Sequence, residues 1–417
     1  MGVLVRQIHR IAGLSRNAKL FLLTVSISAL GNGIFMLLMN LFILARGNDE
    51  AFLGLLMSTM SLTALASSIP MGILVDRLGR KRAMIMGAFL SIPGTLILVL
   101  SPVDWPLMVA AGLYGAGNAI FMAAGPAFMA ENASWEERPT LFSLQSSLSL
   151  IMSFLGSFIG GSLPTLFSYM LRVHPESVTA YRSTLLTAEA IMAFALIPLL
   201  MIEEKPVCKT AVAFPLRNFP FRRDVIALLI PELIIAFGAG LLIPYLNIFF
   251  KQRFRIPDSL LGLIFAVSQL LTGIAAFLAP ILAERLGKIR TVAFTQLTSL
   301  PFLLMLGFVP VLPVAIGAFW LRTMLMNMAG PLYTAFAMER VREEERGTVG
   351  AMIGVAYSVG QSIGPGISGF VQRNFGFPPL FLATGTTYLV AALLTLALFG
   401  QIEYPAVDRG FKNVPPP

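Results

Sequence analysis

Charged residues are scarce in this sequence. Asp, Glu, Lys and Arg make up only 12% of its 417 residues, whereas hydrophobic residues make up 56%. Soluble globular domains carry about 25% charged residues, and the mean hydropathy of this chain is +0.80. The composition therefore excludes a soluble chain and predicts a protein whose surroundings are mostly lipid.

The residues that build most enzyme and metal sites are scarce as well. The single cysteine, Cys208, excludes a disulfide framework and a cysteine-ligated metal site. The two histidines, His9 and His174, flank hydrophobic segments and leave little material for a nucleophile paired with a histidine. No Gly-x-x-x-x-Gly-Lys-Ser or Gly-Lys-Thr motif for cradling ATP phosphates occurs. We therefore expect no enzyme activity, no cofactor and no metal site.

Long apolar segments fill most of the chain. A helix needs about 20 apolar residues to cross a bilayer, and the sequence contains twelve such segments. The predicted spans are 20–45, 51–75, 83–101, 106–129, 141–171, 183–202, 225–250, 259–283, 291–309, 312–337, 348–372 and 378–400. An even number of spans puts both termini on the same side of the membrane.

The basic residues follow this topology rather than a nucleic-acid surface. Of the 30 Lys and Arg residues, 22 lie in the termini and in the loops after the even-numbered spans, and 7 lie in the opposite loops. Because loops rich in Lys and Arg stay in the cytoplasm, we predict cytoplasmic termini, an integral membrane location (the inner membrane in a bacterium) and no nucleic-acid partner. Lys251, Arg253 and Arg255 are the exception: they form either an outer anion-attracting loop or a solvated turn.

A repeat divides the chain into two halves. GILVDRLGRKR at 72–82 returns as PILAERLGKIR at 280–290, and residues 52–93 align without a gap with 260–301, sharing 12 of 42 positions. Elsewhere the shift is 207 for Asn40 and Asn247, and 205 for Gly125 and Gly330. Since each half has an even number of spans, both insert in the same direction, which predicts an all-α protein of two pseudo-symmetric six-helix bundles.

The predicted organisation has five parts. The bundles are residues 20–202 and 225–400, joined by a cytoplasmic linker at 203–224 and followed by a cytoplasmic tail at 401–417. Residues 1–19 form a cytoplasmic N-terminal segment. Arg6, Arg10 and Arg16 occur there without an apolar core and a small-residue cleavage site, so we expect an amphipathic segment on the membrane surface rather than a signal peptide.

The first copy of the repeated motif resembles the signature between helices 2 and 3 of the major facilitator superfamily. The residues that carry the resemblance are Gly72, Asp76, Arg77, Gly79, Arg80 and Arg82. The second copy keeps Glu284, Arg285, Gly287, Lys288 and Arg290, with Pro280 in place of the leading glycine. The resemblance covers nearly the whole chain and implies a twelve-helix secondary transporter whose two halves alternate access to a central site.

The acidic residues of the two motifs have two interpretations. Asp76 faces either the positive N-terminal end of the eleventh span, as a latch that exists only while the cytoplasmic side is closed, or its neighbouring arginine as a local pair. Glu284 has the corresponding place against the fifth span. Gly79 permits the sharp turn that the motif needs, and Gly72 permits a close helix approach.

A second resemblance lies in the eleventh span, whose GQSIGPGISG is similar to the glycine–proline signature of proton-coupled antiporters. Its residues are Gly360, Gly364, Pro365 and Gly369, and the fifth span has Gly156, Gly160 and Gly161 at similar spacing. Ser157 replaces the proline there. Glycines at these spacings also allow close helix packing without any role in antiport.

Three ionisable residues lie inside predicted spans, where a charge costs about 2.5–3.5 kcal/mol at the membrane centre. Arg322 is the strongest candidate for a substrate site, since it stays ionised and needs a carboxylate, carbonyls, water or an anionic solute. Glu189 is a candidate proton carrier, and Glu232 lies nearer the cytoplasmic end of its span. Neutral polar candidates, which otherwise bridge helices, are Asn32, Asn40, Asn118, Asn247, Asn327 and Gln361.

These residues lead to a functional prediction. We expect a secondary active transporter that acts as a monomer and exports a small amphipathic solute in exchange for protons. An anionic-solute importer or uniporter is the nearest rival, because Arg322 suits an anion and the first and fourth spans lack the acids typical of proton-driven drug exporters. A non-transporting sensor or a lipid scramblase on the same scaffold is the alternative from another class.

Overall fold

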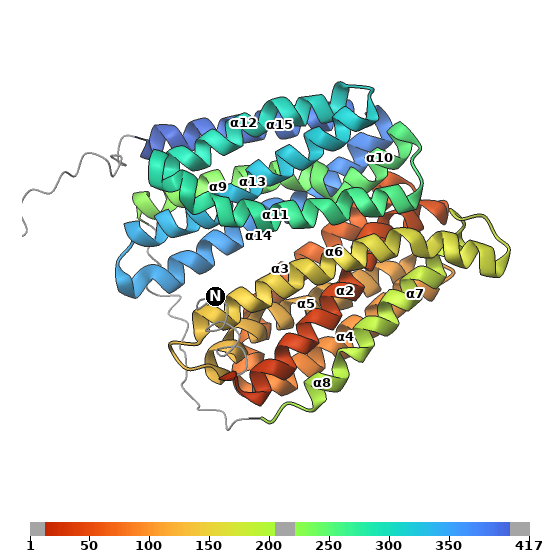
Figure 1. Ribbon diagram of the computed structural model, residues 1–417, viewed down its shortest axis with the longest axis horizontal. Helices are drawn as coiled ribbons and strands as arrows, with labels where there is room; N and C mark the ends of the chain where they lie inside the picture. The colour runs from red at the N-terminus through yellow and green to blue at the C-terminus, as the bar shows by residue number, and fades with distance from the viewer. Residues whose placement is uncertain (1–12, 205–221, 401–417) are drawn as a thin grey trace, which may run out of the picture. The chain divides into compact units, whose positions relative to one another are not determined.

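The computed structural model describes residues 13–204 and 222–400, and all regular elements in these two ranges are helices (Figure 1). The predicted N-terminal segment, linker and tail lie wholly or partly outside these ranges, as does Cys208. The first half contains α2 (Arg16–Ala45), α3 (Glu50–Leu78), α4 (Arg80–Leu100), α5 (Trp105–Asn132), α6 (Arg138–Leu171), α7 (Val178–Phe194) and α8 (Leu196–Leu200). The second contains α9 (Arg223–Leu242), η2 (Ile243–Tyr245), α10 (Leu246–Phe254), α11 (Asp258–Leu286), α12 (Lys288–Phe308), α13 (Leu312–Arg340), η3 (Glu343–Glu345), α14 (Arg346–Phe375) and α15 (Pro378–Phe399).

Each predicted span has a helical counterpart, but two are interrupted at prolines. The sixth span divides into α7 and α8 because Pro198 sits four residues after Phe194, whose carbonyl its ring would crowd. The seventh divides into α9 and α10 around Pro244, within the 3₁₀ turn of η2. Within the described ranges, eleven helical segments are long and apolar enough to cross a membrane. The glycine- and serine-rich α14 is as long as these, at 30 residues, but less apolar.

Short polar signals set several helix starts and turns. The side chains of Ser15, Asp49 and Ser177 accept hydrogen bonds from backbone amides of the first turns of α2, α3 and α7. Gly79 and Gly287 adopt φ of 90° and 85°, which L side chains avoid. These two glycines make the sharp turns between α3 and α4 and between α11 and α12.

The chain divides into two compact units. Among the described residues, the first unit contains 13–204 together with Tyr245–Gln269, and the second contains 222–244 together with 270–400. The division therefore assigns α10 and the beginning of α11 to the first unit, although their sequence belongs to the second half of the repeat.

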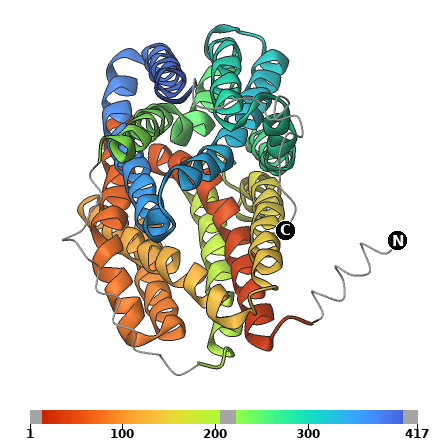
Figure 2. The ribbon, with the colours of Figure 1, turned by 90° about the vertical axis from the view of Figure 1, so that its left-hand side faces the viewer.

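The same helix pairs recur in both units. In the first unit α2 packs against α6 and α7, and α4 packs against α5 and α7. In the second, α9 packs against α14 and α15, and α12 packs against α13 and α15. Figures 1 and 2 show the members of these pairs running alongside one another. In this comparison α7, from the sixth span, is the equivalent of α15, from the twelfth span. The predicted pseudo-symmetry therefore extends to helix packing.

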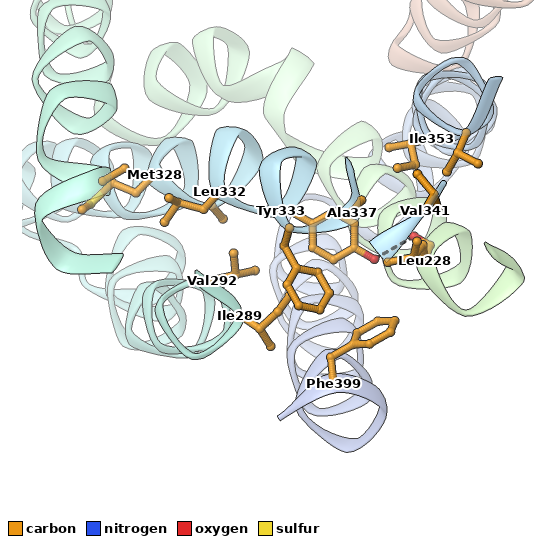
Figure 3. Packing of buried hydrophobic residues seen from close by; sticks show 14 of the residues in the cluster. Leu228, Ile289, Val292, Met328, Leu332, Tyr333, Ala337, Val341, Ile353 and Phe399 are labelled. Carbon is orange, nitrogen blue, oxygen red and sulfur yellow. Dashed lines mark hydrogen bonds between the residues drawn. The ribbon is translucent and has the colours of Figure 1, made fainter. Parts of the chain in front are cut away.

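The two hydrophobic cores are built from equivalent positions. Met84, Ile120 and Phe128 in the first core correspond, at a shift of 208, to Val292, Met328 and Phe336 in the second. Figure 3 shows part of the second core, where the Tyr333 hydroxyl donates to the Leu228 carbonyl at 2.7 Å. The core positions require a shift of 208 between α5 and α13, so the sequence match of Gly125 with Gly330 at 205 is out of structural register by three residues.

Candidate functional site

A cavity of about 560 Å³ lies within the first unit, among α2, α4, α5, α6, α7 and α8. This volume is in the range of small-molecule pockets, which extend from about 300 to 1,000 Å³. Its large apolar lining residues are Phe21, Met36, Phe121, Met122, Met129 and Met192. Flexible methionine and aromatic side chains adapt to apolar surfaces of different shapes, so the wall suits an amphipathic molecule.

Three residues that the sequence singled out line this cavity: Asn32 from α2, Asn118 from α5 and Glu189 from α7. The structure adds polar residues that the sequence did not single out, which are Thr24, Ser28, Ser91, Thr95, Tyr114, Gln145, Ser149 and Ser153. A single sequence gives no signal for them, because hydroxyl residues in apolar helices also bond back to their own helix. Thr95 does so with the Ser91 carbonyl at 2.9 Å.

Glu189 is the one acidic residue in the cavity wall, and its residue surface is only 4% exposed. Thr95 and Tyr114 lie near its carboxyl group. Its Oε2 atom is buried and has no hydrogen-bond partner among the described residues. Among the residues that the structure describes, no Lys or Arg side-chain nitrogen lies within 4.0 Å of a Glu189 carboxyl oxygen. Glu189 is therefore a carboxyl group in a largely apolar wall without a fixed counter-charge.

Arg322 lies in the second unit on α13 and is only 5% exposed. Its Nη2 donates to the Tyr388 hydroxyl on α15 at 2.5 Å, and its guanidinium carbon lies 5.4 Å from the centre of the Tyr388 ring. The Nε atom is buried and has no hydrogen-bond partner among the described residues. Tyr388 is fully buried, and nothing in the sequence marked it as a partner of Arg322.

Further polar side chains extend from this pair toward α14. Tyr357 is close enough to Tyr388 to interact with it electrostatically. Gln361, a predicted candidate, donates from Nε2 to the Tyr357 hydroxyl at 3.2 Å. Gln361 and Tyr357 of α14 thus form a hydrogen-bonded pair near the Arg322–Tyr388 pair.

Two other candidates in the second unit lie apart from this group. Asn327 is exposed and donates to the carbonyl of Thr323, one turn earlier in α13. Glu232 is half-buried on α9 and interacts electrostatically with Tyr333. Because α9 begins at Arg223, Glu232 lies about two and a half turns inside the helix.

Asn40 and Asn247 meet in the first unit near the end that the topology predicts to be extracytoplasmic. Asn40 donates from Nδ2 to Asn247 Oδ1 at 3.1 Å, and Asn247 Nδ2 donates to the Leu37 carbonyl at 2.8 Å. The two asparagines are equivalent in the repeat and both are buried. They join α2 to α10 rather than line the cavity.

A charged group at the same end, which we call the outer cluster, consists of Glu176, Tyr181, Lys251 and Asp258. Lys251 Nζ lies 2.5 Å from Glu176 Oε1 and 2.8 Å from Asp258 Oδ1. The Tyr181 hydroxyl donates to Asp258 at 3.4 Å. The Asp258 and Lys251 side chains are 2% and 11% exposed. Lys251 is therefore neutralised by two carboxylates and does not offer a free anion site; Arg255 caps α10 with a φ of 51°.

Two glycines lie in contact beside the outer cluster. A Cβ atom at Gly262, on α11, would lie 2.5 Å from the Ser157 carbonyl oxygen and 2.8 Å from Gly161 Cα, both on α6. Only glycine fits both helices at this distance. The beginning of α11 is therefore held against α6 by backbone contact.

The loop motifs form matching ion pairs inside each unit. Arg80 binds Asp76 at 2.5 Å and Glu131 at 2.9 Å, and its repeat equivalent Lys288 binds Glu339, the equivalent of Glu131. Asp76 thus makes the local pair that was one of its two interpretations.

The remaining motif residues are mostly at the surface. Arg77, Arg82, Glu284, Arg285 and Arg290 are exposed, and Arg82 pairs with Glu204 at 3.0 Å. No atom of the first unit would come within 4 Å of a Cβ at Gly72, so inside this unit the position is open.

The loop between α5 and α6 contains an acid with a perturbed proton affinity. Glu137 accepts hydrogen bonds from the Ser134 amide at 2.9 Å and the Ser134 hydroxyl at 2.8 Å. Both bonds favour the charged form and lower the pKa of this carboxyl group below its ordinary value. They fix the turn that precedes α6.

The glycine-rich segments lie at helix crossings within each unit. Gly156 and Gly160 on α6 face the backbone of α2, at Leu30 and Ile34. Gly360 and Gly364 on α14 face α9 in the same way, and a Cβ at Gly364 would lie 2.5 Å from the Gly240 carbonyl carbon. Pro365 and Gly369 lie buried in α14, which continues through the proline. Close packing is thus a sufficient reason for these glycines.

Comparisons with known proteins agree with this architecture. The model of the Major Facilitator Superfamily matches residues 21–232 and 228–415. A human protein called MFS-type transporter SLC18B1 is 26% identical over 186 residues, covering 41% of this chain and 40% of that protein. D-xylose-proton symporter-like 1 of Arabidopsis thaliana is 32% identical over 110 residues, covering 26% and 22%. The chain thus spans less than half the length of these curated relatives.

Solved structures are similar over nearly the whole chain. A bacterial homolog of the human lysosomal transporter Spinster, in an inward-facing and occupied conformation, has a TM-score of 0.73 at 16% identity, covering 92% of this chain and 94% of that one. The nucleoside transporter NupG has a TM-score of 0.70 at 14% identity, covering 94% and 100%. At these identities the likeness shows the fold.

Proposed function

We propose that this chain, which belongs to the major facilitator superfamily, is a proton-coupled secondary transporter that moves a small amphipathic solute by alternating access. It is an integral membrane protein of a transporter family. The proposal concerns the solute class, the coupling ion and the residue that carries it.

Glu189 is the observation on which the proposal depends. A buried carboxylate without a counter-ion is costly in an apolar wall, so the group is stable there when it holds a proton or when water reaches it. A change of access that wets or dries the cavity would therefore bind or release a proton at Glu189. Asn32, Asn118 and Gln145 offer hydrogen bonds to the polar part of a solute, and the methionine and phenylalanine wall suits its apolar part.

The outer contacts support alternating access. Asn247, Lys251, Asp258 and Gly262 belong to the second half of the repeat, yet they bind α2, α6 and α7 of the first half. We infer that this closure opens when the halves rock, and that the Asp76 latch closes the opposite, cytoplasmic end. The pairs of small and polar side chains in the outer closure separate without exposing a large apolar surface.

Export in exchange for protons is the direction we propose, with cytoplasmic termini and a monomer as the functional unit. Import of an anionic solute, or its uniport, is the second candidate, and the unpaired Nε of Arg322 favours it. A partial relative is named a proton symporter, which supports proton coupling but suits import as well as export.

The test is uptake of a diverse solute panel into proteoliposomes, with and without an imposed pH gradient. We expect flux of an amphipathic solute that the gradient drives in the wild type and no longer drives in Glu189→Gln, which cannot carry the proton. Gradient-independent solute exchange would favour the uniporter. Rapid lipid flipping without solute flux would contradict the proposal and favour a scramblase, and binding without either would favour a sensor.

A further inference from the structure

We propose that Arg322 and Tyr388 form a recognition site for an anionic group, a carboxylate, sulfonate or phosphate ester, on the transported solute. The inference rests on the proposed transport function and adds to it the chemical class of the solute. The site lies entirely within the second unit, on α13 and α15, with Tyr357 and Gln361 of α14 beside it.

The first argument is the state of Arg322. The residue is 5% exposed, it keeps its charge, and within the described part of the chain no Asp or Glu oxygen lies within 4.0 Å of it. Its one hydrogen bond there is to the neutral Tyr388 hydroxyl. A buried guanidinium usually binds a carboxylate or phosphate, and here the protein supplies the site but no anion.

The second argument comes from the repeat. At the shift of 208 that the two cores share, Arg322 is equivalent to Tyr114, and Tyr357 and Gln361 are equivalent to Ser149 and Ser153. Tyr114, Ser149 and Ser153 all line the cavity of the first unit. The polar group around Arg322 thus occupies positions that, in the other half of the repeat, face a solute-sized space.

The third argument is chemical. A guanidinium presents a planar set of donors that matches two oxygens of a carboxylate, sulfonate or phosphate. The Tyr388 hydroxyl accepts from Arg322 Nη2 and keeps its own proton to donate to an anion oxygen. The side of the guanidinium at Nε remains without a partner in the described residues. A neutral amide of the same shape would gain none of the charge attraction.

Matched pairs of small amphipaths test the charge requirement by binding alone. We would titrate the full-length protein in a neutral maltoside detergent with 4-butylbenzoate and 4-butylbenzamide, and with 4-butylbenzenesulfonate and its sulfonamide, by isothermal titration calorimetry. We expect the wild type to prefer at least one anion over its neutral partner, and Arg322→Gln to bind that anion roughly 30-fold more weakly, equivalent to about 2 kcal/mol.

Two variants separate recognition from folding. Arg322→Lys keeps a charge without the planar donors, so it is expected to keep the preference for the anion at lower affinity. Arg342→Gln removes an exposed arginine of the same unit and is expected to bind like the wild type. If Arg322→Gln is not monodisperse on size exclusion, the test uses Arg322→Lys and Tyr388→Phe instead, the second of which removes the hydroxyl donor. The affinities of these two variants for each anion and its neutral partner are compared with those of the wild type.

The outcomes differ from those of the proposed function. Equal affinity for anion and amide in the wild type, no binding of either anion, or unchanged discrimination in the Arg322 variants would each overturn the anion site. Displacement of the bound probe by phosphatidylglycerol but by no soluble anion would assign the site to a lipid headgroup and overturn the solute assignment. In every one of these cases, proton-driven flux of a neutral solute that requires Glu189 would leave the proposed function intact.

Discussion

A methyl group added at Gly262 should open the outer end. The alanine Cβ would lie 2.5 Å from the Ser157 carbonyl oxygen and 2.8 Å from Gly161 Cα, whereas non-bonded carbon contacts favour about 3.5–4.0 Å. The two helices would have to separate by about 1 Å. Overpacking of this kind costs about 1–3 kcal/mol, so Gly262→Ala should disfavour the closed outer end by about 5- to 150-fold.

Cysteine labelling measures that shift. In a Cys208→Ser background, Ser28→Cys would place a thiol in the wall of the first-unit cavity, and an impermeant maleimide would be added from outside. Gly262→Ala should raise the labelling rate about fivefold or more. The control is Gly112→Ala, whose Cβ would meet only the Thr63 hydroxyl at 3.8 Å. An unchanged rate in Gly262→Ala, or an equal increase in the control, would refute the argument.

Three further predictions concern packing, gating and pH. Gly364→Ala should destabilise the fold by about 1–3 kcal/mol and so lower its unfolding temperature in detergent, because the added Cβ would lie 2.5 Å from the α9 backbone. Gly354→Ala on the same helix meets nothing within 4 Å and should leave the unfolding temperature unchanged. Equal unfolding temperatures for the two variants would count against close packing. Asp76→Asn should slow transport and change cysteine accessibility at the cytoplasmic end if Asp76 is a latch, and wild-type behaviour in both assays would leave only its local pair. Since hydrogen bonds from Ser134 lower the pKa of Glu137, their contribution to stability is present above the ordinary pKa of about 4.3 and is lost as pH falls through the lowered value. Glu137→Gln should therefore have a lower unfolding temperature than the wild type at pH 7 and should lose less stability on acidification. Superimposable plots of unfolding temperature against pH for the two proteins would contradict this prediction.

The fold was predictable because the bilayer imposes it. Apolar length gave the twelve spans, and the repeat gave two halves with the same helix pairing. The breaks at Pro198 and Pro244 were less predictable, because nine other prolines, from Pro70 to Pro365, lie inside helices that continue through them. Whether a proline breaks a helix depends on neighbours that a single sequence does not specify.

The sequence identified the charged members of the candidate site and some of its neutral ones, namely Asn32, Asn118 and Gln361. A buried charge is costly in a membrane, so Glu189 and Arg322 are conspicuous in sequence. Tyr388 and Thr95 are not, because tyrosine and threonine occur in apolar helices for many reasons. The end of the seventh span was also predicted too early: the sequence places Lys251 in a loop, but it lies in α10. There it pairs with the carboxylates of Glu176 and Asp258. Glu176 lies 75 positions from Lys251 in the sequence, beyond any local pattern.

Solute-driven proton movement tests the central claim most directly. Pyranine trapped inside proteoliposomes reports internal pH, and a solute found by the uptake panel would be added outside without an imposed gradient. The account predicts a solute-dependent pH change in the wild type, and in Glu189→Gln solute exchange without that change. Solute flux with no proton movement in the wild type, or equal proton movement in Glu189→Gln, would contradict proton coupling through Glu189.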